Sequence, residues 1–219
     1  YDLLVPITAK DASKLEQMGN TKPMIVVPAG IDTDIKINHC PVPEMNLFFI
    51  GALDWVPNQE GLLWFIDKCF PLIQERFPDI KLKVAGRNAP DWFVKRIANP
   101  LIDFMGEIDD AALYMEQNGI MIVPLFSGSG MRVKIIEGMM HSKAIVTTTI
   151  GCEGIGAQNG TTIFIANTAD EFSKYVISLL SDREMVISVG EMASRFVHQQ
   201  FDNRVFITHL AEFYQNHLK

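Results

Sequence analysis

The residues of this sequence best suited to chemistry follow a Ser/Gly loop at 127–130. Arg132, Lys134 and Glu137 come next, within a helix predicted at 131–141. Small loop residues let the backbone approach an anion, and the first N–H groups of a helix point toward it. Cations in the first turn oppose the helix dipole, at a cost of a few tenths to about 1 kcal/mol each. A bound anion would remove this conflict, so the segment predicts a phosphate-binding site.

Glu137 adds a possible contact to a nucleotide. It lies about 10 Å along the predicted helix axis from Gly130, at 1.5 Å per residue, which is roughly the reach from a diphosphate to the ribose of the same nucleotide. A carboxylate accepts two hydrogen bonds from hydroxyl groups, so vicinal ribose hydroxyls would suit it. The alternative is an ordinary ion pair between Lys134 and Glu137 on a solvated helix face. Both interpretations remain open at this point.

Strands and helices alternate along most of the chain, and the strands are nearly continuous in apolar residues. This pattern predicts an α/β fold, a Rossmann-like parallel sheet of about six strands with helices on both faces. Pro71 is expected to divide the helix at 58–76, and Asp109 to cap the helix at 109–117. The predicted strands are 47–50, 80–85, 101–105, 120–125, 144–148 and 162–165, and the predicted helices are about 58–76, 92–98, 109–117, 131–141, 170–180, 182–200 and 203–218.

Glycines mark the ends of these strands. Gly51, Gly86, Gly106, the loop at 127–130 and Gly151 each follow a predicted strand. The carboxyl ends of parallel strands lie on one edge of a sheet, where such folds bind their ligands. The five loops are therefore expected to converge around the phosphate site.

Residues 1–43 have a different organisation. Strands are expected at 3–7 and 24–28, separated by a helix that Thr8 caps, and a polar, proline-bearing linker is expected over 31–44. The predicted division is a remnant of a preceding N-terminal domain and hinge at 1–43, and a ligand-binding domain at 44–219.

The composition excludes several classes of function. The 219 residues carry a formal net charge of −7, which argues against a general nucleic-acid binder. No apolar run has the length of a membrane span, and the start does not resemble a signal peptide. The three cysteines lack the spacing of a disulfide framework or a zinc site, so a reducing cytoplasm is expected. Asp32 and Asp34 match a metal motif by letters alone, and no metal site is predicted.

Four motifs occur in the order found in one enzyme family. They are GALDWVPN at 51–58, VAGR at 84–87, FMGEIDD at 104–110, and the stretch from VPL to EGM at 123–139. From about Asn46 onward the chain resembles the C-terminal, donor-binding domain of the family 4 retaining glycosyltransferases, which have two facing Rossmann-like domains (GT-B architecture). The resemblance implies transfer of a sugar, with retention, from a nucleotide-diphosphate sugar. It further implies that most of an N-terminal domain is missing.

The resemblance also assigns roles on the central helix. Members carry two glutamates with seven residues between them; Glu137 matches the second, which contacts the ribose, whereas Ser129 replaces the first, beside the donor sugar. A subset of relatives has Gly-x-Arg-x-Lys here, as at Gly130. Arg132 and Lys134 would then contact the diphosphate and stabilise the leaving group without a metal.

Further donor-binding positions follow from the same resemblance. Glu107 and Ile108 would seat the base through backbone contacts, and Arg87 would lie at the edge of that pocket. The whole expected donor-binding set is Gly51, Arg87, Glu107, Ile108, Ser129, Gly130, Met131 and Glu137. The expected acceptor is a glycan or a lipid-linked molecule held by the missing domain, in polysaccharide biosynthesis, with a cytoplasmic location and a possible peripheral association with the inner face of the membrane.

Two alternatives remain open. Without the first glutamate the chain could be an inactive nucleotide-binding or interaction module, or the same architecture could serve a nucleotide-sugar epimerase. A dinucleotide-dependent dehydrogenase is disfavoured, because no Gly-x-Gly-x-x-Gly follows a predicted strand.

Overall fold

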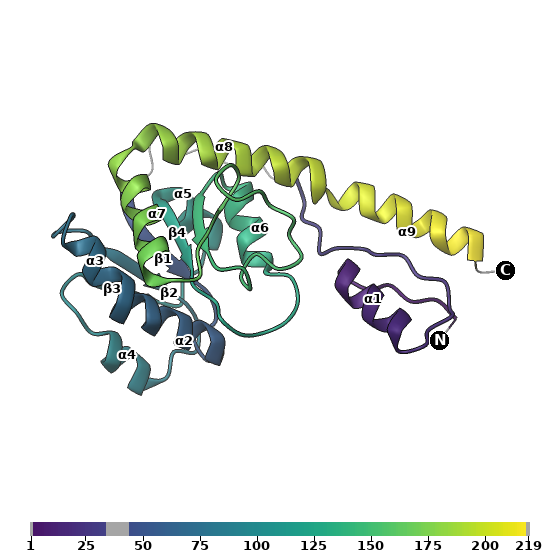
Figure 1. The fold of residues 1–219 in the computed structure, drawn as a ribbon, viewed down its shortest axis with the longest axis horizontal. Helices are drawn as coiled ribbons and strands as arrows, with labels where there is room; N and C mark the ends of the chain where they lie inside the picture. The colour runs from purple at the N-terminus through teal and green to yellow at the C-terminus, as the bar shows by residue number, and fades with distance from the viewer. Residues whose placement is uncertain (1, 34–43, 218–219) are drawn as a thin grey trace.

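The computed structural model describes residues 2–33 and 44–217 (Figure 1). Its centre is a parallel sheet in the order β3-β2-β1-β4-β5-β6, with every neighbouring pair parallel. The strands are β1 (Glu44–Ile50), β2 (Leu82–Ala85), β3 (Ile102–Gly106), β4 (Asn118–Val123), β5 (Ala144–Thr147) and β6 (Phe164–Ile165). The predicted six-stranded parallel sheet is confirmed.

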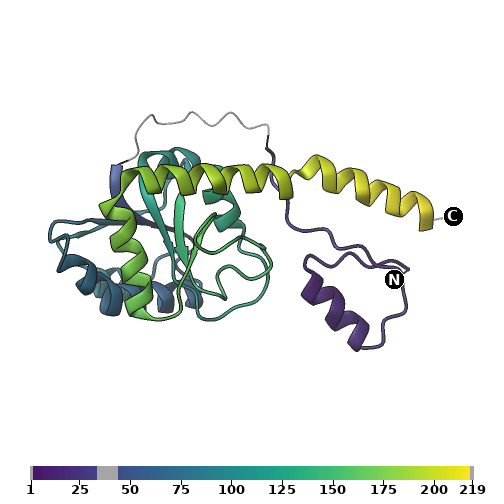
Figure 2. The same ribbon diagram turned by 45° about the horizontal axis from the view of Figure 1, so that its top comes forward.

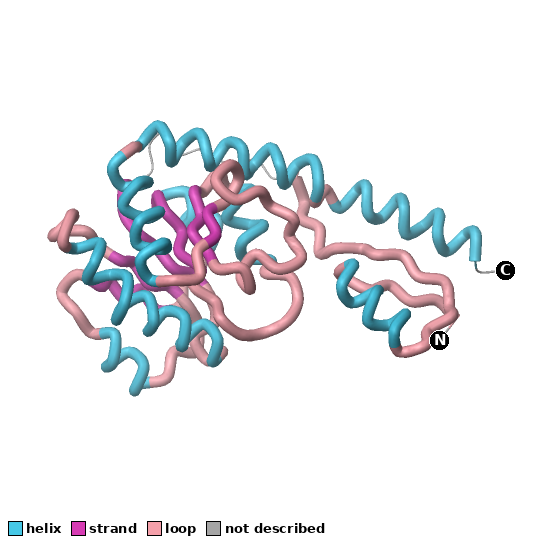
Figure 3. The backbone as a smooth tube through the Cα atoms, viewed as in Figure 1, coloured by secondary structure: helices cyan, strands magenta, loops and turns pink. Residues whose placement is uncertain are grey.

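Helices cover both faces of the sheet, as Figure 3 shows by colour. They are α1 (Ala9–Gln17), α2 (Val56–Trp64), the π-helical turn η1 (Phe65–Cys69), α3 (Phe70–Gln74), α4 (Asp91–Ile97), α5 (Ala111–Gln117), α6 (Val133–Met140), α7 (Ala169–Ser181), α8 (Arg183–Gln200) and α9 (Asn203–His217). None of the helices in the described parts of the chain is long and apolar enough to cross a membrane.

The alternation of side chains along the central strands creates two hydrophobic cores. Phe49 and Ile122 join the core beneath α2, α3 and α7, whereas Phe48 and Met121 join the core beneath α5, α6 and α8. Successive side chains on a strand point to opposite faces, so an unbroken apolar run must be covered on both sides. Burying each such side chain contributes about 1.5–3 kcal/mol.

The predicted helix at 58–76 is divided as expected. α2 passes into η1 and then into α3, and Phe70 donates its N–H to the carbonyl of Phe65, five residues back. Pro71 has no N–H to continue the regular ladder, so the carbonyl four residues before it is left free and the helix widens by one residue there. The prediction that Pro71 interrupts this helix is confirmed.

The N-terminal segment contains α1, and its flanking strands differ from the prediction. The Thr8 hydroxyl accepts a hydrogen bond from the Asp11 N–H at 3.1 Å, which confirms the predicted cap. The segments at 3–7 and 24–28 form only an isolated parallel bridge between Leu4 and Met24. The two strand predictions there are wrong, because these segments have only each other to pair with in the described residues.

α9 returns the chain to this N-terminal segment (Figure 2). Ile31 donates its N–H to the Phe201 carbonyl at 2.9 Å and accepts one from Asn203 at 3.1 Å. The Arg204 guanidinium reaches the Thr33 hydroxyl at 3.3 Å. The predicted linker and domain division fall largely on residues 34–43, outside the described residues.

Several predicted ends shift by a few residues. The largest correction of a cap concerns α5, because Asp110 rather than Asp109 accepts the hydrogen bond from the Leu113 N–H at 2.9 Å. Aspartate is a favourable N-cap residue at either position, and only the backbone angles decide which of the two precedes the first helical residue.

Gly61 gives a testable account of how closely α2 packs on the sheet. A β-carbon at this position would lie 1.5 Å from the Pro124 carbonyl oxygen, a backbone atom that cannot move aside. We expect Gly61→Ala to lower the free energy of unfolding by about 1–3 kcal/mol, measured by chemical denaturation. The control Glu60→Ala, on the exposed side of the same helix, should change it by less than about 0.5 kcal/mol. A stable Gly61→Ala variant would show that α2 lies farther from Pro124.

Candidate functional site

The candidate site lies at the carboxyl edge of the sheet, where the loops after β1, β4 and β5 meet the start of α6. β1 and β4 are adjacent in the sheet, which brings their following loops together although they are distant in sequence. This is the edge at which the sequence predicted a phosphate site.

Arg132 occupies a different position from the predicted one. α6 begins at Val133, and Arg132 is its non-helical N-cap. Its guanidinium bends back and donates hydrogen bonds to the carbonyls of Ser129 at 2.6 Å and Gly130 at 2.8 Å. The expectation that both cations lie in the first helical turn is therefore wrong for Arg132, because its side chain satisfies loop carbonyls and its backbone departs from helical angles.

Trp55 completes the environment of this arginine. The guanidinium lies 5.5 Å from the centre of the Trp55 ring, within the range of a cation–π contact. Arg132 is buried, and burial lowers its pKa, although Glu153 acts in the opposite direction. Arg132 Nε has no hydrogen-bond partner in the described structure. In this conformation Arg132 holds the backbone of the loop at 127–130, which is called the phosphate loop below after the site predicted there.

Lys134 does lie in the first turn of α6, and it turns toward the loop after β1. Its ammonium donates a hydrogen bond to the Asn58 Oδ1 atom at 2.8 Å and lies 4.5 Å from the centre of the Phe49 ring. Asn58 is fixed in turn by a 2.8 Å hydrogen bond from its Nδ2 to the Ala52 carbonyl. Gly51 leaves room for this group, since a β-carbon there would lie 3.0 Å from Lys134 Nζ.

The electrostatics of Lys134 are unusual for a lysine. Burial, together with the positive charge of Arg132, lowers its pKa to about 7. Its hydrogen-bond partner, Asn58, is uncharged, and the described structure shows no carboxylate paired with it. A buried cation without a counter-ion is costly, and an incoming anion would restore the charged form.

Glu137 lies one turn farther along α6 and remains exposed. No hydrogen bond or ion pair joins it to Lys134 in the described structure, so the alternative of an ordinary surface ion pair is not found. Partial burial raises the pKa of its carboxyl group. Its oxygens are therefore available to a ligand at this edge.

The remaining predicted donor-binding residues lie on the loops after β2 and β3 and just before α6. Arg87 and Glu107 are exposed after β2 and β3, whereas Ile108 and Met131 pack partly against the core beneath α6. No hydrogen bond or ion pair in the described residues links the Arg87 or Glu107 side chain to Lys134. Their loops nevertheless adjoin the loop after β1, because the Leu53 N–H donates a hydrogen bond to the Arg87 carbonyl at 2.9 Å and a β-carbon at Gly86 would lie 2.0 Å from the Gly51 carbonyl oxygen.

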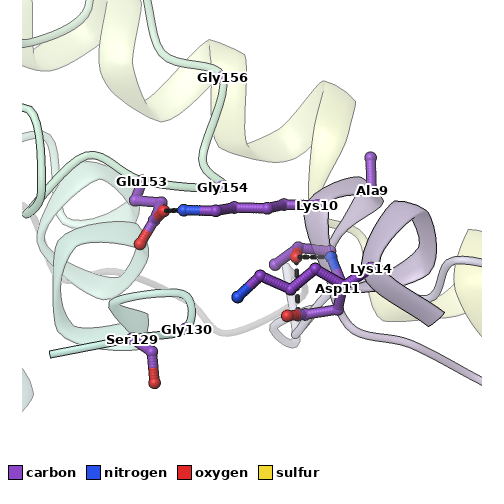
Figure 4. Close-up of a pocket in the computed structure, with 10 residues that line it drawn as sticks. Ala9, Lys10, Asp11, Lys14, Ser129, Gly130, Glu153, Gly154 and Gly156 are labelled. Carbon is purple, nitrogen blue, oxygen red and sulfur yellow. Dashed lines mark hydrogen bonds and ion pairs between the residues drawn. The ribbon is translucent and has the colours of Figure 1, made fainter. Parts of the chain in front are cut away.

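A cavity of about 380 Å³ adjoins the loop on the side of α1 (Figure 4). Ser129 and Gly130 line it on one side and Lys14 on the other, and Glu153 forms an ion pair with Lys10 across it. This volume falls in the range of small-molecule sites. No group of three or more potential metal-binding side chains occurs in the part of the chain that is described.

Two residues of this site were missed as candidates. Asn58 appeared only as part of a motif and as a helix start, and Glu153 only as part of the loop after β5. Asn58 is buried in the fold, but Gln59 and Glu60 follow it in the sequence, so no local pattern indicated its hydrogen-bonded role. Glu153 had no such indication, because its partner Lys10 lies 143 positions away in the sequence.

Comparison with known proteins identifies the family. A family model described as glycosyl transferases group 1 matches residues 44–182, more than half of the chain. The chain belongs to this family. Its fold is the Rossmann-like fold of one half of a GT-B glycosyltransferase, as the solved structures below show.

A curated relative of this group 1 chain is the uncharacterized 44.6 kDa protein in the cps region of Klebsiella pneumoniae. The two are 27% identical over 168 residues, which cover 73% of this chain and 43% of that protein. The chain thus spans less than half the length of this relative.

Two solved structures share the fold of the group 1 chain. A glycosyltransferase from Rickettsia africae superposes with a TM-score of 0.79 at 18% identity, over 98% of this chain and 63% of its own. Anabaena Alr3699/HepE in complex with UDP and glucose gives a TM-score of 0.76 at 14% identity, again over 98% of this chain and 63% of its own.

The lowered pKa of Lys134 predicts how stability depends on pH. Its pKa is about 7 in the folded protein against 10.5 for a free lysine, so unfolding between these values takes up a proton and stability rises with pH. Lys134→Met removes this titration. We expect the parent to gain up to about 1.4 kcal/mol per pH unit relative to the variant between about pH 7.5 and 9.5, measured by urea denaturation.

The control for this experiment is Lys174→Met, on the exposed side of α7. It should follow the pH dependence of the parent. Parallel curves for the parent and Lys134→Met would show that Lys134 stays charged in the folded protein.

Proposed function

We propose that this chain binds the donor of a family 4 retaining glycosyltransferase, a nucleotide-diphosphate sugar, and belongs to the Gly-x-Arg-x-Lys subset. The observation that carries the proposal is the buried ammonium of Lys134 beside the phosphate loop, hydrogen-bonded to the neutral Asn58. A diphosphate at the loop would supply the missing negative charge. The first N–H groups of α6 would add hydrogen bonds to the same oxygens.

The nucleoside end of the donor would lie along α6. Glu137 has carboxylate oxygens available one turn beyond Lys134, and vicinal ribose hydroxyls are suitable donors to them. HepE, which shares the fold, was solved with UDP and glucose. UDP is therefore the first nucleotide to test. We retain Gly51, Arg87, Glu107, Ile108 and Met131 as proposed donor contacts.

In the proposed reaction the bond between the sugar and the β-phosphate oxygen breaks, and negative charge develops on the departing diphosphate. A protonated Lys134 would stabilise this charge without a metal ion. Arg132 would act by holding the carbonyls of Ser129 and Gly130, so that the backbone of the loop is preorganised around the phosphate. It could also reach the diphosphate itself if these hydrogen bonds exchanged.

We place the acceptor, a glycan or a lipid-linked molecule, on a part of the protein outside this chain. The proposal extends to polysaccharide biosynthesis, since the relative from K. pneumoniae is named for its place in a cps region. The proposal also includes a cytoplasmic location and peripheral contact of the protein with the membrane.

A second candidate is a binding module without transferase activity. Ser129 favours it, because the loop itself offers no carboxylate to the cavity. Nothing in the structure favours an epimerase.

Binding of UDP is expected to take up a proton. At pH 8 most of the Lys134 ammonium groups are deprotonated, since the pKa is about 7, and a bound diphosphate would raise that pKa. Calorimetric titration in buffers of different ionisation enthalpy should show uptake of nearly one proton by the parent. Lys134→Met should bind more weakly and without uptake. UDP binding by the parent with no proton uptake would place the diphosphate away from Lys134.

The role of Glu137 can be separated from a general loss of binding. We expect Glu137→Ala to weaken UDP binding by about 1–3 kcal/mol, the value of hydrogen bonds to a charged group. It should also abolish the preference for UDP over 2′-deoxy-UDP, which lacks one of the two hydroxyls. Calorimetric titration with both nucleotides measures this. Glu191→Ala, on the exposed side of α8, is the control, and a preference unchanged in Glu137→Ala would contradict the assignment.

A further inference from the structure

Glu153 lies in the loop between β5 and β6 and lines the same cavity as Ser129 and Gly130. The opposite wall is formed by the first turns of α1, with Thr8, Lys10 and Lys14. Position 129 carries a hydroxyl, so the carboxylate that faces α1 from this side of the cavity is that of Glu153 (Figure 4).

The Glu153 carboxylate is held in place by one oxygen. Its Oε1 atom accepts a hydrogen bond from the Lys10 ammonium, whereas no hydrogen bond to Oε2 occurs in the described structure. In Figure 4 the second oxygen turns away from Lys10, toward the side on which Ser129 and Gly130 lie. The group is therefore oriented by one wall of the cavity and has a free acceptor for a ligand.

The charge of this carboxylate is stable at neutral pH. The hydrogen bond from Lys10 lowers its pKa most, and the charges of Lys10, Arg132 and Lys14 lower it further. An ionised carboxylate is an acceptor only, so it selects ligand groups that donate hydrogen bonds and repels phosphate. The diphosphate is therefore assigned to Lys134 and the backbone of the loop at 127–130, not to Glu153.

The cavity and the phosphate loop are continuous through Gly130. A donor whose diphosphate binds at the loop would extend either along α6, toward Glu137, or into the cavity, toward Glu153. The nucleoside is assigned to the first direction. The sugar, which carries several hydroxyl donors, would then extend into the cavity toward Glu153.

We propose that the Glu153 carboxylate binds the hydroxyl groups of the donor sugar, with Lys10 of α1 as the positioning residue that orients it. This inference rests on the proposed function and adds the residue that recognises the transferred group. It also gives α1 a role at the site, because α1 supplies the cation that holds the carboxylate across the cavity.

The test separates the sugar from the nucleotide. The 219-residue chain is titrated calorimetrically with UDP, GDP and ADP, and with UDP-glucose, UDP-N-acetylglucosamine, UDP-galactose, GDP-mannose and ADP-glucose. For the nucleotide that binds, Glu153→Gln should leave the affinity for the diphosphate within about twofold. It should weaken binding of the matching nucleotide sugar about tenfold or more, as expected for hydrogen bonds to a charged acceptor.

Lys10→Met tests the positioning role, since it breaks the same ion pair and keeps the carboxylate; it should weaken binding of the nucleotide sugar, by a smaller factor than Glu153→Gln does. Glu191→Gln, on the exposed side of α8, is the matched control and should leave the affinity for the nucleotide sugar within about twofold. Equal losses for nucleotide and nucleotide sugar in Glu153→Gln, no loss at all, or a loss in Lys10→Met as large as in Glu153→Gln would each overturn the inference. Absence of binding by every nucleotide would instead refute the proposed function, so the two failures are distinguishable.

Discussion

The site depends on one electrostatic constraint, the burial of the Lys134 ammonium with no charged partner among the described residues. A hydrogen bond to Asn58 and the face of the Phe49 ring replace only part of the hydration that the ammonium loses. Burial therefore lowers the pKa to about 7. An anion bound beside a lysine in this state would raise its pKa again.

The sheet makes this arrangement possible by its strand order. β1 and β4 are neighbours, so the loop that carries Asn58 and the helix that carries Lys134 start from the same edge. α2 packs so closely on the end of β4 that Gly61 has no space for a β-carbon. The close packing fixes Asn58, and through it the lysine.

One wall of the cavity is formed by α1, which lies outside the sheet. α1 and the loop after β5 meet across the cavity through Lys10 and Glu153, and α9 ties the N-terminal segment to the end of α8 through Ile31. The position of α1 relative to the sheet therefore affects the shape of the cavity.

The sequence by itself determined the order of helices and strands from Glu44 onward, the interruption at Pro71 and the Ser/Gly loop before α6, because apolar periodicity, proline and glycine act locally. It also placed Lys134 in the first turn of α6. It did not determine the inward turn of Arg132 onto the carbonyls of Ser129 and Gly130. Nor could it show the contacts of Lys134 with Asn58 and of Glu153 with Lys10, which join residues 76 and 143 positions apart. Tertiary packing decided these contacts, because only the folded sheet brings the hydrogen-bond partners of these side chains within reach.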